Sequence, residues 1–318
     1  MMEEDCRKQC TVSTIVVTVF SFGLLLFLFS QSFLNEYFHF SLHSEEKTFS
    51  HFIVHIPKTG GHYTARVLKS LITNTLEEIS GKETYRLCDL GVGSIENFQS
   101  KWTTIWTGIQ CNLWMSEQPI ARVRHQHAYT IIRDPKEHVS SQYFHCKESK
   151  QHEDRAYLMP EFDEWLDYYI ARLDTGKNVG TRNSVTGEFA CYNPINMQSY
   201  FTGFDEGQTD DDLLKRFDII GDGHQLSKSI CAISTRYLGH VPPLCDCSLT
   251  NDKRKLNEDD HGVTHHGATV HLTDDQANKI ANLTRLDSLL YERTKNVFMK
   301  QVQEIEEEFN VVLCHNLD

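Results

Sequence analysis

The segment that most constrains the fold covers residues 51–71, HFIVHIPKTGGHYTARVLKSL, because three local patterns follow one another in it. An apolar run over residues 52–56 ends at Pro57 and has the length and composition of a buried strand. The sequence KTGG follows. After it, apolar residues recur at three- and four-residue spacing, which is typical of one face of a helix. The segment therefore predicts a strand, a glycine-containing loop and a helix in immediate succession.

This arrangement favours anion binding. The start of a helix offers free backbone N–H groups and the positive end of the helix dipole. Two glycines let the backbone approach a phosphate, and Lys58 adds a point charge. The loop that binds nucleoside triphosphates has its lysine after the glycines, whereas Lys58 precedes them. The residues predicted to bind a phosphate-containing cofactor here are Lys58, Thr59, Gly60, Gly61, His62 and Tyr63. An ordinary strand-to-helix turn is the alternative.

A second motif lies at residues 128–135, AYTIIRDP, and continues to Ser141 and Tyr143. Its short apolar strand ends at Arg133, and Pro135 is expected at the first position of a helix. The ordinary structural role for this arginine is an ion pair with Asp134 or another carboxylate.

The two motifs together resemble those of the membrane-bound Golgi carbohydrate sulfotransferases, which use 3′-phosphoadenosine 5′-phosphosulfate (PAPS). The heparan sulfate 6-O-sulfotransferases look most similar. In that family a PKTGG-type loop holds the 5′-phosphosulfate and an RDPxxRxxSxY-type segment holds the 3′-phosphate. The resemblance implies an α/β fold with a P-loop-like central parallel sheet flanked by helices. It also implies transfer of a sulfuryl group from PAPS to a hydroxyl of a carbohydrate acceptor of the glycosaminoglycan kind, with no metal.

The resemblance assigns roles to individual residues. Lys58 is expected to neutralise the bridging and leaving oxygens of the donor, while Arg133 and Ser141 match the ligands of the 3′-phosphate. The chain departs from the family pattern after the glycines, where His62 and Tyr63 replace small hydroxyl residues. A further departure is His138, which occupies the position of the second arginine and either weakens the 3′-phosphate site or leaves it to another residue.

The catalytic base is not settled by the sequence. The 6-O branch carries its catalytic histidine in a GLHADW-like segment, and the best local match, residues 108–112, places Gln110 there. Glutamine can orient a hydroxyl but cannot accept its proton. His62, inside the loop, is the alternative. His125 and His127 precede the strand that ends at Arg133, roughly 20 Å from the donor, and are interpreted as structural.

The amino-terminal region predicts a membrane anchor. Residues 12–29 are almost unbroken apolar sequence, with Arg7 and Lys8 before them and Glu36 as the first charge afterwards. A cleaved signal peptide is the competing interpretation. The predicted organisation is a cytoplasmic tail at residues 1–10, a transmembrane signal-anchor at 11–32, a stem at 33–50 and a lumenal sulfotransferase domain at 51–318.

The cysteines agree with a lumenal domain. Two of the ten cysteines precede the apolar span, and eight follow it: Cys88, Cys111, Cys146, Cys191, Cys231, Cys245, Cys247 and Cys314. An even number in an oxidising compartment predicts disulfides, and zinc is the rival reading. Cys245 and Cys247 are too close for an easy bridge and are expected to have separate partners. Asn282 begins the predicted glycosylation site, Asn282-Leu283-Thr284.

The rest of the chain predicts alternating strands and helices, which indicates a parallel sheet covered on both faces. Further strands are expected at residues 103–107, 128–132 and 217–221. Helices are expected at 136–149, 161–173, 225–238 and 273–309, with Thr273 and Gln276 as a capping box. Residues 174–192 and 239–271 are expected to be loops. His261, His265, His266 and His271 are interpreted as part of a solvated loop rather than a metal site.

The net charge of −13 argues against a general nucleic-acid role. Two other classes compete with a sulfotransferase. One is a catalytically weakened relic of the same fold that binds a nucleotide or a glycan, which Gln110 favours. The other is a small-molecule kinase of the P-loop type, which the missing GK[ST] disfavours.

Overall fold

A computed structural model describes residues 49–79, 87–89, 112–149, 153–154, 156–173, 189, 191–248 and 271–315 of the 318-residue chain. These residues belong to one compact unit, Thr48–Asp318. Within them, a five-stranded sheet is parallel throughout, with the order β2-β3-β1-β4-β5. The strands are β1 (Phe49–Val54), β2 (Leu87–Asp89), β3 (Leu113–Ser116), β4 (His125–Ile132) and β5 (Ile219–Asp222).

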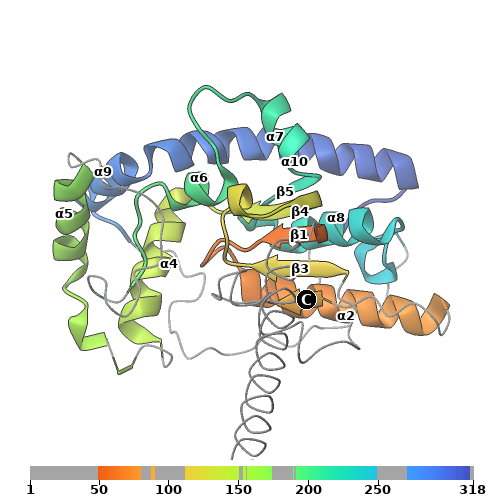
Figure 1. The fold of residues 1–318 in the computed structure, drawn as a ribbon, viewed down its shortest axis with the longest axis horizontal. Coiled ribbons are helices and arrows are strands. Elements are labelled where there is room, and N and C mark those ends of the chain that lie inside the picture. Colours follow the sequence, from red (N-terminus) through yellow and green to blue (C-terminus); the bar gives the residue numbers. More distant parts are fainter. Residues whose placement is uncertain are drawn as a thin grey trace, which may run out of the picture. The chain divides into compact units, whose positions relative to one another are not determined.

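Helices cover the sheet and extend beyond it (Figure 1). The α-helices are α2 (Gly61–Ile79), α4 (Pro135–Glu148), α5 (Phe162–Leu173), α6 (Met197–Thr202), α7 (Asp210–Arg216), α8 (Leu226–Leu238), α9 (Asp274–Leu283) and α10 (Arg285–Phe309). Short 3-10 helices lie at η1 (Ile120–Arg122), η3 (Ala156–Leu158), η5 (Gly223–Gln225) and η6 (Pro243–Cys245).

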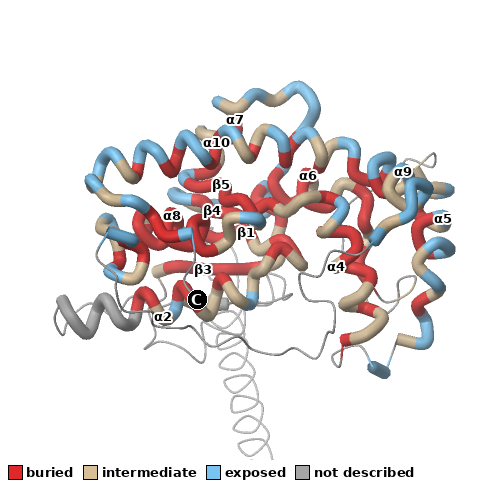
Figure 2. The backbone as a smooth tube through the Cα atoms, turned by 180° about the vertical axis from the view of Figure 1, so that it is seen from behind, coloured by how far each residue is buried: buried red, intermediate tan, exposed pale blue. Residues whose placement is uncertain are grey.

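The sheet has a hydrophobic core on each face, because successive side chains of a strand point in opposite directions. In β1, Phe52 and Val54 join the core that includes residues of α4, α5, α6 and α9. Ile53 joins the other core, which includes residues of α2, α8 and the carboxyl half of α10. Figure 2 shows the strands buried between exposed outer helix surfaces. The two covered faces explain why the strands read as continuous apolar runs.

The long helix α10 protects the edge of the sheet next to β5 (Figure 1). Its buried Gln301 accepts a hydrogen bond from the backbone N–H of Ile220 at 3.0 Å. The amide of Gln301 also donates to the carbonyl of Asp218 at 3.0 Å. The side chain therefore replaces part of a neighbouring strand and satisfies backbone groups that an edge strand leaves open.

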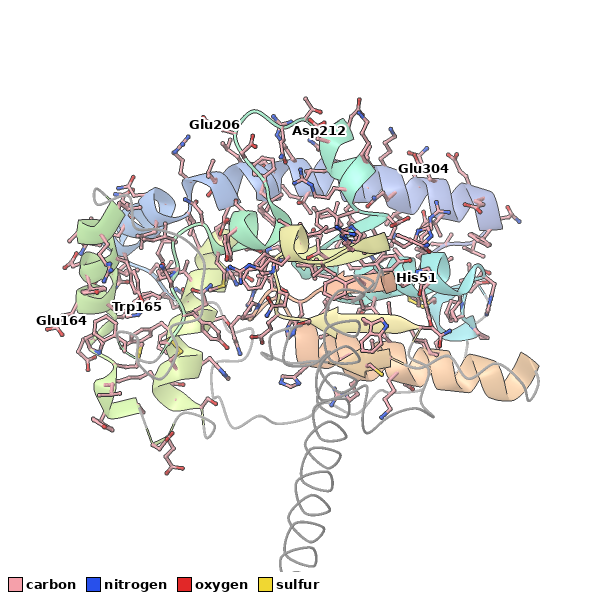
Figure 3. All side chains as sticks on the ribbon, viewed as in Figure 1. His51, Glu164, Trp165, Glu206, Asp212 and Glu304 are labelled. Atoms are coloured by element: carbon pink, nitrogen blue, oxygen red, sulfur yellow. A yellow bond between two sulfur atoms is a disulfide. The ribbon has the colours of Figure 1, made fainter. Side chains whose placement is uncertain are left out.

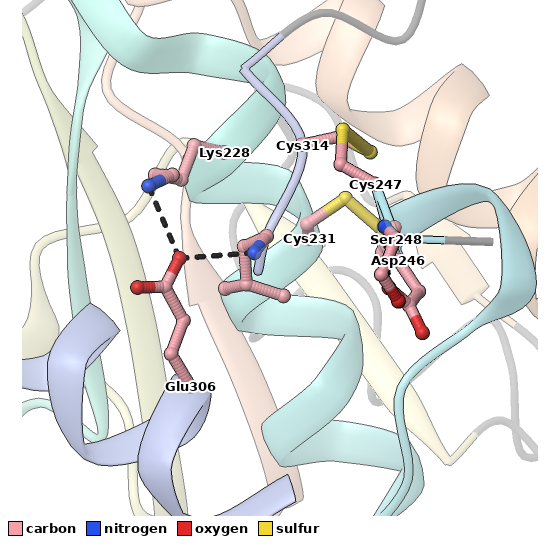
Figure 4. Close-up of a disulfide and its surroundings, with 9 residues drawn as sticks. Lys228, Cys231, Asp246, Cys247, Ser248, Glu306 and Cys314 are labelled. Atoms are coloured by element: carbon pink, nitrogen blue, oxygen red, sulfur yellow. Dashed lines mark hydrogen bonds and ion pairs between the residues drawn. A yellow bond between two sulfur atoms is a disulfide. The ribbon is translucent and has the colours of Figure 1, made fainter. Parts of the chain in front are cut away.

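Disulfides tie the carboxyl-terminal part of the unit together. Cys231 in α8 is bonded to Cys245, and Cys247 is bonded to Cys314 (Figure 4), so the prediction of separate partners for Cys245 and Cys247 is confirmed. A third disulfide joins Cys146 to Cys191. Near the disulfide between Cys247 and Cys314, one carboxylate oxygen of Glu306 accepts hydrogen bonds from Lys228 at 3.2 Å and from the backbone N–H of Leu313 at 2.9 Å (Figure 4).

Most of the predicted elements that fall on described residues are confirmed. The strands predicted at 52–56, 128–132 and 217–221 correspond to β1, β4 and β5, and the predicted helices correspond to α2, α4, α5, α8 and the pair α9–α10. The capping box of Thr273 and Gln276 is present at the start of α9. The strand predicted at 103–107 lies outside the described residues. The sequence did not predict β2, β3, α6 or α7, which are too short for a clear periodicity.

The predicted anchor at residues 11–32 also lies outside the described residues. Among the helices that the structure does describe, none combines the length and the apolar character needed to cross a membrane.

Candidate active site

The sheet topology selects one place for a ligand. After β1 the chain moves to the side of β2 and β3, and after β4 it moves to β5 on the other side. In open parallel sheets ligands bind outside the carboxyl ends of strands, at the point where successive connections diverge. Here that point lies between β1 and β4, where the loop over residues 55–60 and Arg133 emerge.

The loop between β1 and α2 has an unusual backbone. Lys58 has a φ of 71° and Gly60 a φ of 92°, so a lysine occupies the left-handed region that favours glycine. The buried Thr59 hydroxyl donates to the carbonyl of Ile56 at 2.9 Å, which closes the turn. A strained backbone conformation of this kind costs free energy, persists where the surrounding structure enforces it, and is concentrated at functional sites. The backbone therefore marks Lys58 as a residue of functional interest.

Gly61 allows a close approach that no other residue would permit. A Cβ atom added there would lie 1.7 Å from Nε2 of His55, so the imidazole packs directly against the start of α2. The first turn of α2 contains no acidic residue, in contrast to α4, α7 and α9. The N–H groups at the start of a helix and the positive end of its dipole thus make a favourable environment for an anion here.

The ammonium group of Lys58 makes no hydrogen bond or ion pair with any residue that the structure describes. Burial, together with the nearby Arg133 guanidinium, lowers the pKa of Lys58 to about 8, and the carboxylate of Glu117 acts in the opposite direction. A partly desolvated cation beside a second cation is unfavourable without an anion. The site is therefore arranged to accept negative charge.

Arg133 is brought to the same loop. It follows the last residue of β4, and its Nη1 donates to the backbone carbonyl of Lys58 at 3.2 Å. Its Nε donates to Glu137, one turn along α4, at 3.2 Å. The ion pair that was the structural alternative for Arg133 is therefore present, and the carboxylate is that of Glu137. Asp134 instead caps α4 by accepting from the backbone N–H groups of Lys136 and Glu137. A guanidinium has further N–H donors for a ligand.

A buried network holds the backbone of Arg133. The Oε1 atom of Gln198 accepts from the Arg133 N–H at 2.8 Å, and its Nε2 donates to the Arg133 carbonyl at 2.9 Å. Asp287, which is fully buried, accepts from the backbone N–H groups of Gln198 and Ser199 at 3.1 and 2.7 Å. Burial raises the pKa of Asp287 to about 6. Sequence reasoning missed these residues because they lie about 65 and 155 positions from Arg133 in the chain and carry no local signal.

His138 lies beneath the loop. Its Nε2–H donates to the carbonyl of Pro57 at 2.7 Å, and the side chain is fully buried. Burial lowers the pKa of His138 to about 3, so the ring is neutral. The residue that replaces the family's second arginine thus supports the loop from inside, and as placed it has no exposed face with which to bind a phosphate.

The other predicted site residues are placed as follows. His62 is exposed in the first turn of α2, and Tyr63 is partly buried beside Arg66, whose guanidinium lies 5.6 Å from the ring centre. Ser141 is half-buried in α4, and no hydrogen bond joins it to Arg133 among the described residues. Gln110, the predicted base position, lies outside the described residues, so its role stays a prediction.

Two further predictions concern residues away from this edge. His127 lies near the amino end of β4, where it contacts Asp218 at 2.9 Å and stacks on His51. His51 (Figure 3) lies in the amino half of β1, whereas Lys58 follows the carboxyl end of that strand, which agrees with a structural role for these histidines. Asn282 is exposed on α9, and the hydroxyl of Thr284 in the same glycosylation sequence donates to the carbonyl of Ile280.

No metal centre emerges from the part of the chain that the structure describes, since no group of three or more potential ligands comes together there. Of the four clustered histidines, only His271 is described, and it is exposed. The sequence was also compared with family models and with curated proteins, and neither comparison finds a match. Any functional conclusion therefore depends on the geometry of the site and on the motifs.

Proposed function

We propose that this chain binds PAPS at the carboxyl edge of β1 and β4 and transfers its sulfuryl group to a carbohydrate hydroxyl. The observation that carries the proposal is the convergence of two separate anion-binding motifs on one loop. The ammonium group of Lys58 makes no ion pair with a described residue and lies just before the start of α2, while Arg133 donates to the Lys58 carbonyl at 3.2 Å. A donor with phosphates at both its 5′ and 3′ positions suits two such cationic centres.

The assigned roles follow from the charges that develop during transfer. Lys58 lies at the start of α2, where it would neutralise the oxygen that leaves with the 5′-phosphate. Arg133, fixed by Gln198, would hold the 3′-phosphate with help from Ser141. Thr59, Gly60, Gly61, His62 and Tyr63 would supply the backbone cradle. The parallel sheet is consistent with the P-loop-like architecture that the motifs imply, and the same family would place the chain in the Golgi membrane through residues 11–32.

Ligand protection of the full chain tests the donor site. We expect 3′-phosphoadenosine 5′-phosphate to raise the unfolding temperature, because a ligand at 100 times its Kd stabilises by about 2.7 kcal/mol. The matched ligands are 5′-AMP, which lacks the 3′-phosphate, and ATP, which a kinase would prefer. Equal protection by 5′-AMP would contradict the role of Arg133 and Ser141, and selective protection by ATP would favour a kinase.

A second candidate is a relic that retains the nucleotide site but no longer transfers the group. The observation that favours it is Gln110 at the position where the similar family has its basic histidine. Incubation with radiolabelled donor and a panel of glycans separates the two. Nucleotide binding with no labelled glycan and no release of sulfate from the donor would favour the relic.

A further inference from the structure

The sequence leaves the catalytic base unsettled, and the structure places a carboxylate near the candidate site. Glu117 follows β3 directly, at the same edge of the sheet as the candidate site. β1 and β3 pair in parallel with Val54 opposite Ser116, and the N–H of His55 donates to the carbonyl of Ser116 at 2.9 Å. Glu117 is therefore level with the first residues of the loop that carries Lys58.

The charge of Glu117 reaches the site. Its side chain is 13% exposed, and its carboxylate raises the pKa of Lys58 against the larger, opposing effect of burial. Asp134, which caps α4, and Glu137, which pairs with Arg133, lie at the same edge. Glu117 is the acidic residue whose charge acts on Lys58 itself.

The imidazole of His55 lies beside this carboxylate. Its Nδ1 lies 4.0 Å from Oε1 of Glu117, and its ring packs against Gly61 at the start of α2. The imidazole thus lies between the carboxylate and the phosphate loop. This places a proton acceptor at the edge of the sheet where the donor would bind. In an in-line transfer the attacking hydroxyl approaches sulfur from the side opposite the leaving oxygen, and a carboxylate on that opposite side would take its proton.

We infer that Glu117 is the general base that deprotonates the acceptor hydroxyl, an inference that rests on the proposed sulfuryl transfer. The acceptor oxygen forms a bond to sulfur while the bond from sulfur to the 5′-phosphate oxygen breaks. The electron pair of the broken bond stays on that phosphate oxygen, beside Lys58, and 3′-phosphoadenosine 5′-phosphate leaves. The hydroxyl proton passes to the carboxylate of Glu117 and afterwards to solvent.

The test compares Glu117→Gln, Glu117→Ala and the native full chain, with Glu304→Gln as the matched control. Glu304 is exposed on α10 (Figure 3) and has no hydrogen bond or ion pair within the described residues. Two rates are measured: transfer to a glycan panel and release of sulfate from PAPS, with water as the acceptor. Binding of 3′-phosphoadenosine 5′-phosphate is measured by calorimetry for every variant.

We expect Glu117→Gln to lower the rate by about 10²–10⁴, the usual contribution of a general base, while nucleotide affinity changes less than threefold. Formate should restore part of the rate of Glu117→Ala but not that of Lys58→Ala, because only the former lacks a carboxylate. A merely structural role would not give this rescue.

Three results would overturn the inference. Native rates in Glu117→Gln would show that another group takes the proton. A loss without rescue by formate, accompanied by weaker nucleotide binding, would show a structural role. A native chain that binds the nucleotide but neither transfers nor releases sulfate would have no base to assign. Failure to bind the nucleotide at all would instead contradict the proposed function, so the two failures are distinguishable.

Discussion

Replacing Lys58 by methionine should stabilise the protein while abolishing its proposed use. The folded chain holds the pKa of Lys58 at about 8, against 10.5 for a free side chain. Each pKa unit corresponds to 1.36 kcal/mol, so keeping this ammonium charged at pH 7 costs roughly 3 kcal/mol relative to water. Methionine retains the length of the side chain and removes the charge. We expect a gain of about 1–3 kcal/mol at pH 7, because partial solvation of the lysine reduces the full value.

The pH dependence provides the sharper test. Below pH 8 Lys58 is protonated in both the folded and the unfolded chain, so burial of its charge reduces the unfolding free energy by the full amount there. Between pH 8 and 10.5 Lys58 loses its proton in the folded chain before it does so in the unfolded chain, and the loss of unfolding free energy becomes smaller. The advantage of Lys58→Met in unfolding free energy should therefore be largest at pH 7 and should vanish near pH 10.5.

The assay is denaturant or thermal unfolding of the full chain in detergent at several pH values, without nucleotide. For a unit of this size 1 kcal/mol corresponds to about 2–4 °C. Lys300→Met is the matched control, since Lys300 is exposed on α10 without a hydrogen bond or ion pair to another described residue, and it should change stability by less than about 0.5 kcal/mol. Lower stability of Lys58→Met than of the native chain would refute the interpretation that Lys58 is a desolvated cation without a bound anion. So would a gain in unfolding free energy that stays constant up to pH 10.5.

Other predictions test the surroundings of Lys58. Affinity for 3′-phosphoadenosine 5′-phosphate should fall as the pH rises above 8, because binding then requires uptake of a proton by Lys58; calorimetry of Lys58→Arg should show a flat profile from pH 7 to 9.5. Gly61→Ala should abolish nucleotide binding, since the new Cβ enters the ring of His55, and His55→Ala should restore part of the binding in the double variant; no difference between single and double variants would contradict this. Gln198→Ala should weaken binding of that nucleotide more than binding of 5′-AMP, because it releases the backbone of Arg133; an equal loss for both ligands would point to a general structural effect.

The sequence determined the local parts of this protein. The apolar run, the glycines and the helical spacing after Pro57 specify strand, loop and helix within about twenty residues, since each pattern depends on neighbours in the chain. Pro135 likewise marks the start of α4, and the close spacing of Cys245 and Cys247 excluded a bond between them. Such signals need no knowledge of the tertiary structure.

The tertiary structure decided which of these parts meet. Arg133 reaches the carbonyl of Lys58 only because β4 pairs directly with β1, and Glu117 reaches the loop because β3 pairs on the other side. Strands β2 and β3 are too short to show a periodicity in the sequence, and their places in the sheet follow from pairing with adjacent strands. The lowered pKa of Lys58 depends on burial and on a cation 75 positions away, which are properties of the packed state. Contacts between distant residues depend on how the whole chain packs, and for that reason no local pattern contains them.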